Sequence, residues 1–380
     1  MIYKDFKGKR LSQLGMGCMR LPTVGGNDSA IDEEQVARMV DYAFEHGINY
    51  FDTAYGYHGG NSETVMGKVL GRLPRDRIYI ADKFPGYDLS NMPKAKSIFP
   101  EQLKKLGISY FDFYMFHNVN EMNVNQYLDR SYGIYDYLLE QRDAGKISHL
   151  GFSAHGNMDT IRKFLDAYGE NMEFCQLQLN YVDWEFQDGE KKVEMLEELG
   201  IPVWVMEPMR GGKLIDIPED GKAELEKLRP GVKPAEWAFR FLQSIPEAKV
   251  ILTGASSMEQ LKENIEIFGT ERPTDARETE TLEKIGKGMT ARQTLPCTAC
   301  RYCVPKCPMD LDIPDLIASY NQLMFTGASD FIAPFYIKSL PEDSRPSACI
   351  GCGECEKVCP QNLHIPEAFE DFTERIKGWM

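Results

Sequence analysis

Eight of the ten cysteines in this 380-residue chain fall into two short runs near its C-terminal end. The first run is Cys297, Cys300, Cys303 and Cys307, and the second is Cys349, Cys352, Cys355 and Cys359. Both runs read C-x₂-C-x₂-C-x₃-C-P, ending on Pro308 and Pro360. This spacing is the ligand pattern of a chain that carries two [4Fe–4S] clusters.

In such a pair, the fourth cysteine of each run binds the cluster of the other run. We therefore assign Cys297, Cys300, Cys303 and Cys359 to one cluster, and Cys349, Cys352, Cys355 and Cys307 to the other. Two alternatives are weaker. Tetrahedral zinc would leave the third cysteine of each run idle, and disulfides would leave unpaired thiols beside the bridges. Cys18 and Cys175 lie in apolar segments and are expected to be buried small hydrophobic residues.

Composition bounds the class of protein. The net charge of −15 argues against a nucleic-acid partner. No apolar run approaches the roughly 20 residues of a membrane helix, and the first residues have no apolar signal core. Thiolate-bound clusters need a reducing environment, so we expect a cytoplasmic protein without membrane partners.

Residues up to about 270 repeat one pattern, in which an amphipathic helix is followed by a glycine and then by a buried strand. The first such helix is expected to begin at the N-cap Asp32 and to end at Gly47. After an initial hairpin we expect eight strands, at 14–18, 50–52, 78–83, 111–116, 149–153, 174–179, 203–206 and 250–253. Eight units of this kind predict an α/β fold, a (β/α)₈ TIM barrel.

The barrel is expected to cover residues 1–275, and residues 276–380 are expected to form a mostly helical ferredoxin-like domain with the two clusters. Helices are expected at 278–286, 315–323 and 366–372. No G-x-G-x-x-G motif follows a strand, which argues against a doubly wound dinucleotide fold.

Four polar side chains follow neighbouring strands of the predicted barrel, at the ends where barrel active sites lie. They are Asp52, Tyr57, Lys83 and His117. A phenol is a poor acid at neutral pH, but a buried ammonium would stabilise its phenolate and lower its pKa. Lys83 could do this for Tyr57, with Asp52 orienting the lysine and His117 binding the reacting oxygen. Each residue alone could be structural, and their joint placement is what favours a catalytic site.

Several motifs resemble the aldo/keto reductase superfamily. Phe51-Asp52-Thr53-Ala54-Tyr55-Gly56-Tyr57, followed by Gly59-Gly60-Asn61-Ser62-Glu63, is similar to its signature. The first strand, Gly15–Leu21, and the segments Ala81-Asp82-Lys83 and Tyr114-Met115-Phe116-His117 also resemble the family. With its C-terminal extension, the chain resembles the oxidoreductases that fuse this barrel to a 4Fe–4S module. The resemblance implies reduction of a small carbonyl substrate by NAD(P)H, with Tyr57 as the acid.

The cofactor contacts implied by the resemblance are only partly present. Ser153 and Gln176 match residues that bind the carboxamide, but Ala154-His155 replaces the family's asparagine. Met206 and Glu207 stand where an aromatic residue and a serine are expected. Arg210 either pairs with Glu207 or, with Gly211-Gly212, forms an anion site. The clamping segment retains Gly254, Ser256, Gln260 and Asn264. Ser257 replaces the cation for a 2′-phosphate, so NADH is expected to bind at least as well as NADPH.

Two other functions stay open at this point. Hydride transfer and one-electron cluster chemistry are normally joined by a flavin, so a flavin-dependent enzyme that binds FMN in the barrel is one alternative. The other alternative is an electron-transfer protein with a non-catalytic barrel. It is favoured by the replacement of expected cofactor-binding residues at Ala154, Met206 and Glu207. All three functions allow a redox partner protein, and the sequence does not identify the substrate.

Overall fold

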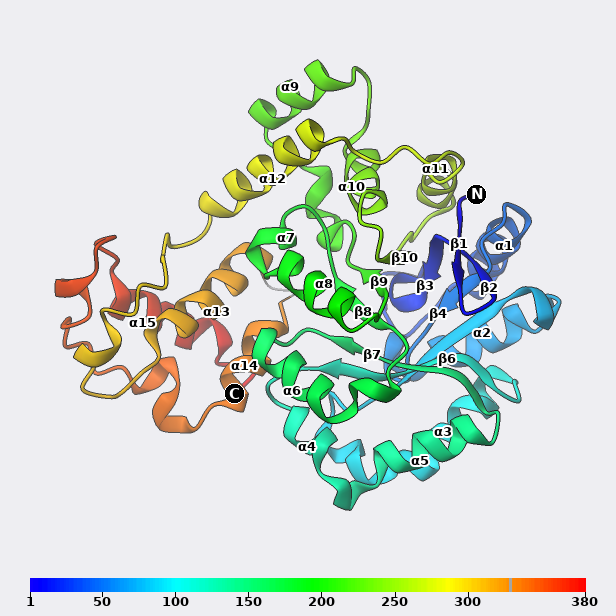
Figure 1. Ribbon diagram of the computed structural model, residues 1–380, viewed down its shortest axis with the longest axis horizontal. Helices are drawn as coiled ribbons and strands as arrows, with labels where there is room; N and C mark the ends of the chain where they lie inside the picture. Colours follow the sequence, from blue (N-terminus) through cyan, green and yellow to red (C-terminus); the bar gives the residue numbers. More distant parts are fainter. Residues whose placement is uncertain (328–329) are drawn as a thin grey trace. The chain divides into compact units, whose positions relative to one another are not determined.

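The computed structural model describes residues 1–327 and 330–380, and its larger part is a closed parallel barrel (Figure 1). The barrel strands are β3 (Leu14–Gly17), β4 (Tyr50–Asp52), β5 (Tyr79–Phe84), β6 (Phe111–Val119), β7 (Ile147–Ala154), β8 (Cys175–Gln178), β9 (Val203–Met206) and β10 (Ala248–Thr253). They pair in sequence order, and β10 pairs with β3 to close the ring. The predicted eight-stranded barrel is therefore confirmed, with each strand within two or three residues of its expected position.

Helices connect successive strands. They are α1 (Glu33–Glu45), α2 (Ser62–Leu70), α3 (Ala95–Leu106), α4 (Val124–Leu128), α5 (Ile134–Asp143), α6 (Met158–Tyr168), α7 (Asp183–Phe186), α8 (Gly189–Glu198), α9 (Glu219–Leu228), α10 (Pro234–Gln243) and α11 (Met258–Ile267). The Asp32 side chain caps α1 by accepting from the Gln35 amide, as the sequence predicts. Gly47 then has φ 94°, a conformation that lets the chain reverse into β4.

The N-terminal hairpin covers one end of the barrel core. Strands β1 (Tyr3–Phe6) and β2 (Lys9–Ser12) are antiparallel and place Phe6 and Leu11 in an apolar cluster. Other buried members of that cluster are Tyr50, Phe113, Phe174, Trp204 and Val250. This end is filled with side chains. The strands are parallel, so the polar residues at their C-terminal ends lie at the opposite end of the barrel.

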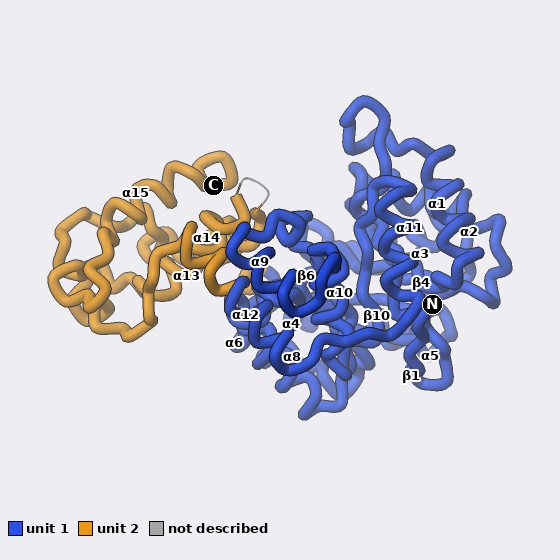
Figure 2. The backbone as a smooth tube through the Cα atoms, turned by 90° about the horizontal axis from the view of Figure 1, so that it is seen from above, with its two compact units in different colours: residues 1–119, 123–285 blue, residues 120–122, 286–380 orange. Residues whose placement is uncertain are grey.

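The chain divides into two compact units (Figure 2). The first comprises residues 1–119 and 123–285, and the second comprises 120–122 and 286–380, whereas the sequence placed the boundary at 275/276. The helix α12 (Ala276–Ala291) is longer than expected, and α13 (Ile313–Thr326) and α15 (Ile365–Ile376) contain the two other expected helices. The sequence did not indicate α14 (Ile332–Ser339). The second unit has no strand among its described residues, which agrees with a mostly helical domain.

Candidate active site and cluster sites

A buried ion pair lies at the barrel mouth. Lys83 Nζ at the end of β5 lies 2.5 Å from Asp52 Oδ1 at the end of β4 and donates to the Thr53 carbonyl at 2.7 Å. Adjacent strands β4 and β5 bring these groups together, because Asp52 pairs with Ala81 in register. Gln176 on β8 donates to the second oxygen of Asp52 at 3.0 Å. Asp52 and Lys83 are thereby fixed from three strands.

Two aromatic rings complete the group of predicted catalytic residues. Tyr57 lies in the loop after β4, with its ring centroid 5.1 Å from Lys83 Nζ. The His117 ring at the end of β6 stands edge-on to Tyr57 at 6.0 Å and to Tyr87 at 5.1 Å. His117 Nδ1 is buried without a hydrogen-bond partner among the described residues. The structure therefore brings the four residues together at one end of the barrel.

Burial and charge set the protonation states of this group. Burial lowers the pKa of His117 well below its ordinary value, and the charge of Lys83 adds to the effect, so the ring is neutral. Burial lowers the pKa of Lys83, but the Asp52 charge and hydrogen bond, together with Tyr57 and Asp82, raise this pKa above its ordinary value. Burial raises the pKa of Tyr57, and Lys83 only partly offsets this. Lys83 thus acts in the expected direction, but burial outweighs it, so the pKa of Tyr57 lies above its ordinary value and the phenol stays protonated at neutral pH.

A second set of buried polar groups contacts the backbone of Lys83. Asp82 and Glu63 are fully buried, and Asp82 Oδ1 accepts from the Lys83 amide at 2.8 Å. Gln102 Nε2 donates to Glu63 at 3.0 Å and to the Lys83 carbonyl at 3.0 Å. Lys105 reaches Glu63 at 2.9 Å. Burial, and then the neighbouring Glu63 charge, raise the pKa of Asp82 well above its ordinary value.

The expected carboxamide ligands have partners within the barrel. Ser153 Oγ accepts from the Asn118 amide at 2.8 Å, and Gln176 donates to Asp52. Ala154, which follows Ser153 where the family has asparagine, has no polar side chain. Burial lowers the pKa of the next residue, His155, to about 3, so its ring is a neutral imidazole. A neutral imidazole can donate one hydrogen bond and accept another, but it does not reproduce the planar amide pattern.

The expected clamping residues cluster after β10. Ser257 caps α11 by accepting from the Gln260 amide, and Gln260 Oε1 accepts from the Ser256 amide at 2.9 Å. Asn264 donates to Thr253 Oγ1 at 2.7 Å. These contacts form a compact turn that begins at Gly254, at the end of the barrel where phosphate sites form after the seventh and eighth strands.

The sequence did not reveal Arg20, which lies beside this turn. Its guanidinium pairs with Glu207 Oε1 at 3.2 Å, and its carbonyl accepts from Ser256 Oγ at 2.8 Å. A Cβ atom on Gly254 would lie 3.2 Å from Arg20 Cδ, which is a tight contact, so the Arg20 side chain packs closely against this turn. Arg210, the expected anion ligand, is buried and pairs with Asp183 at 2.9 Å. Arg20, which follows the Gly15-x-Gly17 strand, is therefore an exposed cation beside this turn.

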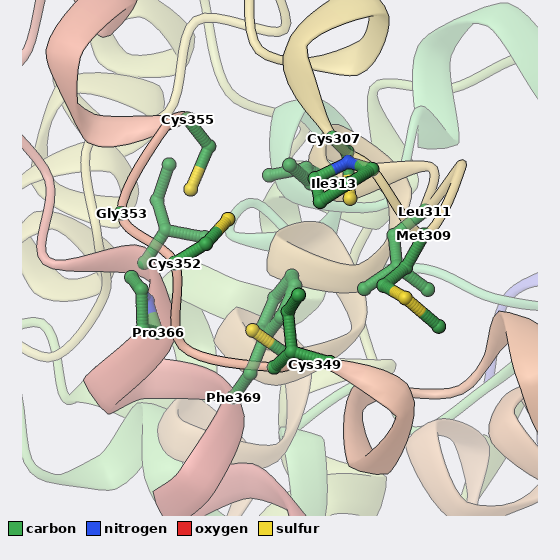
Figure 3. A pocket seen from close by; sticks show the side chains of 13 residues that line it. Cys307, Met309, Leu311, Ile313, Cys349, Cys352, Gly353, Cys355, Pro366 and Phe369 are labelled. Carbon is green, nitrogen blue, oxygen red and sulfur yellow. The ribbon is translucent and has the colours of Figure 1, made fainter.

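The cysteines of the second unit line two separate cavities. Cys297, Cys300, Cys303 and Cys359 line one, and Cys307, Cys349, Cys352 and Cys355 line the other. Figure 3 shows the four side chains of the second quartet directed into their cavity. Ile365 at the start of α15 borders both cavities. Each quartet draws its fourth cysteine from the other run, which is the arrangement expected from the spacing.

The two runs share one backbone conformation. Left-handed φ angles recur at matching places, at Ala299 and Gly351, Arg301 and Gly353, and Asp310 and Asn362. Among the described residues no three His, Cys, Asp or Glu side chains converge closely enough for a single metal ion. A cubane spreads its thiolates more widely because each binds a different iron. The eight thiol donors and their apolar surroundings thus fit two clusters better than zinc.

The barrel with its strand-end Asp, Tyr, Lys and His residues defines the class as an oxidoreductase barrel. Residues 13–287 match the aldo/keto reductase family and residues 296–364 match the 4Fe-4S dicluster domain. The chain belongs to the aldo/keto reductase family, with a ferredoxin-type dicluster domain attached. By homology it is an NAD(P)-dependent oxidoreductase, and the dicluster domain implies two clusters.

Three relatives illustrate the similarity. "Probable aldo-keto reductase 1" of Glycine max is 30% identical over 54% of this chain, which spans 58% of that protein. "NADH-specific methylglyoxal reductase" of Escherichia coli is 26% identical over 67% of this chain and 89% of its own length. The solved structure of aldo-keto reductase AKR11C1 from Bacillus halodurans, in its holo form, is 25% identical with a TM-score of 0.60. It covers 75% of this chain and 96% of its own.

The fold is shared at still lower identity. The aldo/keto reductase from Klebsiella pneumoniae, solved with NADP and acetate, is 18% identical with a TM-score of 0.58 and covers 73% of this chain and 93% of its own. Within residues 1–327 and 330–380, no helix combines the length and apolar character needed to span a membrane.

Proposed function

We propose that the barrel reduces the carbonyl group of a small molecule to an alcohol, with Tyr57 as the general acid. The observation that carries this proposal is the buried Asp52–Lys83 pair at 2.5 Å with the Tyr57 ring 5.1 Å from the ammonium. A protonated phenol beside a fixed positive charge suits proton donation to an oxygen that is becoming negative.

The nicotinamide, when bound, supplies the hydride to the carbonyl carbon. Tyr57 gives its proton to the carbonyl oxygen, and Lys83 stabilises the phenolate left behind. Asp52 holds Lys83 in place through an ion pair, so the ammonium needs no reorganisation during the reaction. His117 is neutral and can donate a hydrogen bond to the same oxygen, which orients the carbonyl toward Tyr57. Water then returns a proton to Tyr57.

For the cofactor, we propose that NADH binds at least as well as NADPH. Ser257 provides no charge for a 2′-phosphate and is occupied as the cap of α11. The nucleotide would be bordered by the clamping residues Gly254, Ser256, Gln260 and Asn264. Arg20 would leave its ion pair with Glu207 and bind the diphosphate of the nucleotide. Ser153 and Gln176 would face the carboxamide, and buried Arg210 would support the loop after β9.

For the second unit, we propose that the two quartets hold one [4Fe–4S] cluster each and exchange single electrons with a redox partner protein. Thiolate-bound clusters require a reducing setting, which supports a cytoplasmic location. The direction of electron flow depends on the cluster potentials, which span about −700 to +450 mV across proteins.

The test is anaerobic purification followed by three measurements on one preparation. Iron and sulfide should correspond to two clusters, and titration with NADH should show binding. Small aldehydes and ketones should then be reduced with consumption of NADH. Released flavin in the acid-soluble fraction, without nicotinamide binding, would instead support the FMN-dependent alternative. Clusters without any nicotinamide binding would support an electron-transfer protein with a non-catalytic barrel.

A further inference from the structure

The residue directly after Tyr57 has an unusual backbone conformation. His58 has φ 54° and ψ 43°, in the left-handed region, and its side chain is almost completely buried. Residues other than glycine are uncommon in this region, and such positions persist only where neighbouring contacts hold them. The next residue, Gly59, is left-handed as well, at φ 63°. Together they turn the chain sharply just beyond the Tyr57 Cα atom.

Both ring nitrogens of His58 contact the segment between β3 and α1. Nε2 lies 3.1 Å from the Leu21 amide nitrogen, and Nδ1 lies 2.7 Å from the Asp28 carbonyl oxygen. The Leu21 amide can only donate, so Nε2 accepts and the proton of the neutral ring is on Nδ1, where it is donated to Asp28. The Asp28 carboxylate lies 3.1 Å from the same Nδ1. The ring thus joins two backbone points that are seven residues apart.

The same segment is held at two further positions. Asn61 Nδ2 donates to the Ser29 carbonyl at 2.9 Å. A Cβ atom on Gly59 would lie only 2.6 Å from Ser29 Oγ, so the two backbones approach closely there. Ser62 Oγ, at the start of α2, donates to the Cys18 carbonyl at 3.2 Å. The loop that carries Tyr57 is therefore clamped on one side by residues 18–29.

We propose that His58 is a positioning residue that fixes the Tyr57 hydroxyl relative to Lys83. The hydrogen bonds of the clamp are made by His58, Asn61 and Ser62, so His58 acts on Tyr57 through the backbone. A change of His58 to a right-handed or extended conformation would rotate the preceding peptide and displace the Tyr57 side chain. This inference rests on the proposed role of Tyr57 as the general acid.

Three substitutions separate the backbone conformation from the two hydrogen bonds. His58→Gly accepts the left-handed conformation without strain but removes both bonds. His58→Asn tolerates this conformation and keeps one side-chain acceptor. His58→Ala removes the bonds and disfavours the conformation. The control is His46→Ala, because the exposed His46 stacks on Tyr42 at the C-terminal end of α1.

The full-length, cluster-loaded variants are compared by kcat, KM for an aldehyde, the NADH dissociation constant and the unfolding midpoint. We expect His58→Gly to lower kcat roughly 10- to 100-fold, as small misplacements of catalytic groups do. Its NADH affinity should change less than about twofold, and His58→Asn should recover part of kcat. A kcat that matches the wild type in His58→Gly, or that falls only with the folded fraction, would overturn the inference.

Failure of the proposed function is recognised separately. If the wild-type protein reduces no carbonyl, that proposal fails, and a crystal structure of His58→Gly then decides the inference alone. A Tyr57 side chain displaced from its wild-type position supports the role of His58. A Tyr57 side chain in its wild-type position refutes it.

Discussion

The Lys83 ammonium lies 2.5 Å from Asp52 Oδ1, and the two side chains are 0% and 3% exposed. Buried charges of this kind depend on each other, because removing one leaves the other without compensation. We expect Asp52→Asn and Lys83→Met each to destabilise the protein by about 3–5 kcal/mol. The double variant should lose clearly less than the sum of the single variants. Urea unfolding of all four proteins measures this coupling, and simple additivity would show that the pair is not coupled.

Tyr57→Phe removes the proposed acid and keeps the ring. General acid catalysis typically contributes 10²–10⁴-fold, so kcat should fall by about that factor. NADH affinity and the unfolding midpoint should stay close to the wild type, because the ring still packs against Lys83 and His117. Tyr55→Phe is the matched control, since the Tyr55 hydroxyl donates to Glu101 near the surface. Equal turnover in Tyr57→Phe and the wild type would remove Tyr57 from the mechanism.

Asp82 should make stability depend on pH. Burial beside Glu63 raises its pKa in the folded state, so the folded protein holds a proton that the unfolded chain releases at lower pH. The stabilising contribution is complete below the unfolded pKa and is lost as pH rises toward the folded pKa. Asp82→Asn keeps a neutral side chain at every pH.

We therefore expect the free energy of unfolding of Asp82→Asn at pH 8 to exceed that of the wild type by about 1–3 kcal/mol. This is the cost of leaving a buried polar group unsatisfied. This advantage should shrink as pH falls toward 4. Denaturant unfolding at several pH values measures it. Asp41→Asn, an exposed carboxylate paired with Arg72, serves as the control. An advantage that stays constant with pH would contradict the proposed protonation of Asp82.

Cys307→Ser tests the crossed ligand sets. Cys307 belongs to the first run in sequence but lines the cavity of Cys349, Cys352 and Cys355. We expect the variant to lose or convert the cluster of the second run, with up to about half of the iron lost. Iron analysis and electron paramagnetic resonance should resolve the remaining cluster. Cys175→Ser, which replaces a buried thiol of β8, should keep all the iron.

Arg20→Gln tests the proposed diphosphate contact. Loss of a charge-assisted hydrogen bond should weaken NADH binding about tenfold, because Glu207 would then face the diphosphate without its counter-charge. Fluorescence titration with NADH measures the change. Arg38→Gln, an exposed arginine on α1, is the control. Unchanged NADH affinity in Arg20→Gln would place the diphosphate elsewhere.

The barrel was predictable because its signals are local. A glycine follows each of several helices, a buried strand follows each glycine, and the eight expected strands are the eight observed. Asp52, Lys83 and His117 could be placed together because parallel strands end at one face of a barrel. The cysteine quartets followed from spacing alone, since the repeat fixes which thiolates meet.

Other features depend on tertiary structure. Arg20 and Glu207 are 187 residues apart, and no local pattern links them. The direction of the Tyr57 pKa shift depends on how deeply the phenol is buried, which spacing does not reveal. No sequence signal marks His58, because its backbone conformation and its partners at 21 and 28 appear only in the folded chain. Each cysteine run is followed by one similar helix, α13 after the first and α15 after the second. Helix α14 has no matching helix after the second run, so comparison of the two runs did not predict it.

The exchange of one cysteine between the runs also constrains when the metal centres can form. The quartet that begins at Cys297 has only three of its cysteines until residue 359 has been synthesised. The quartet that contains Cys307 stays incomplete until residue 355 has been synthesised. If each quartet holds one cluster, neither ligand set is complete until both runs have been synthesised. A chain truncated between the runs would hold three ligands of one proposed cluster and a single ligand of the other.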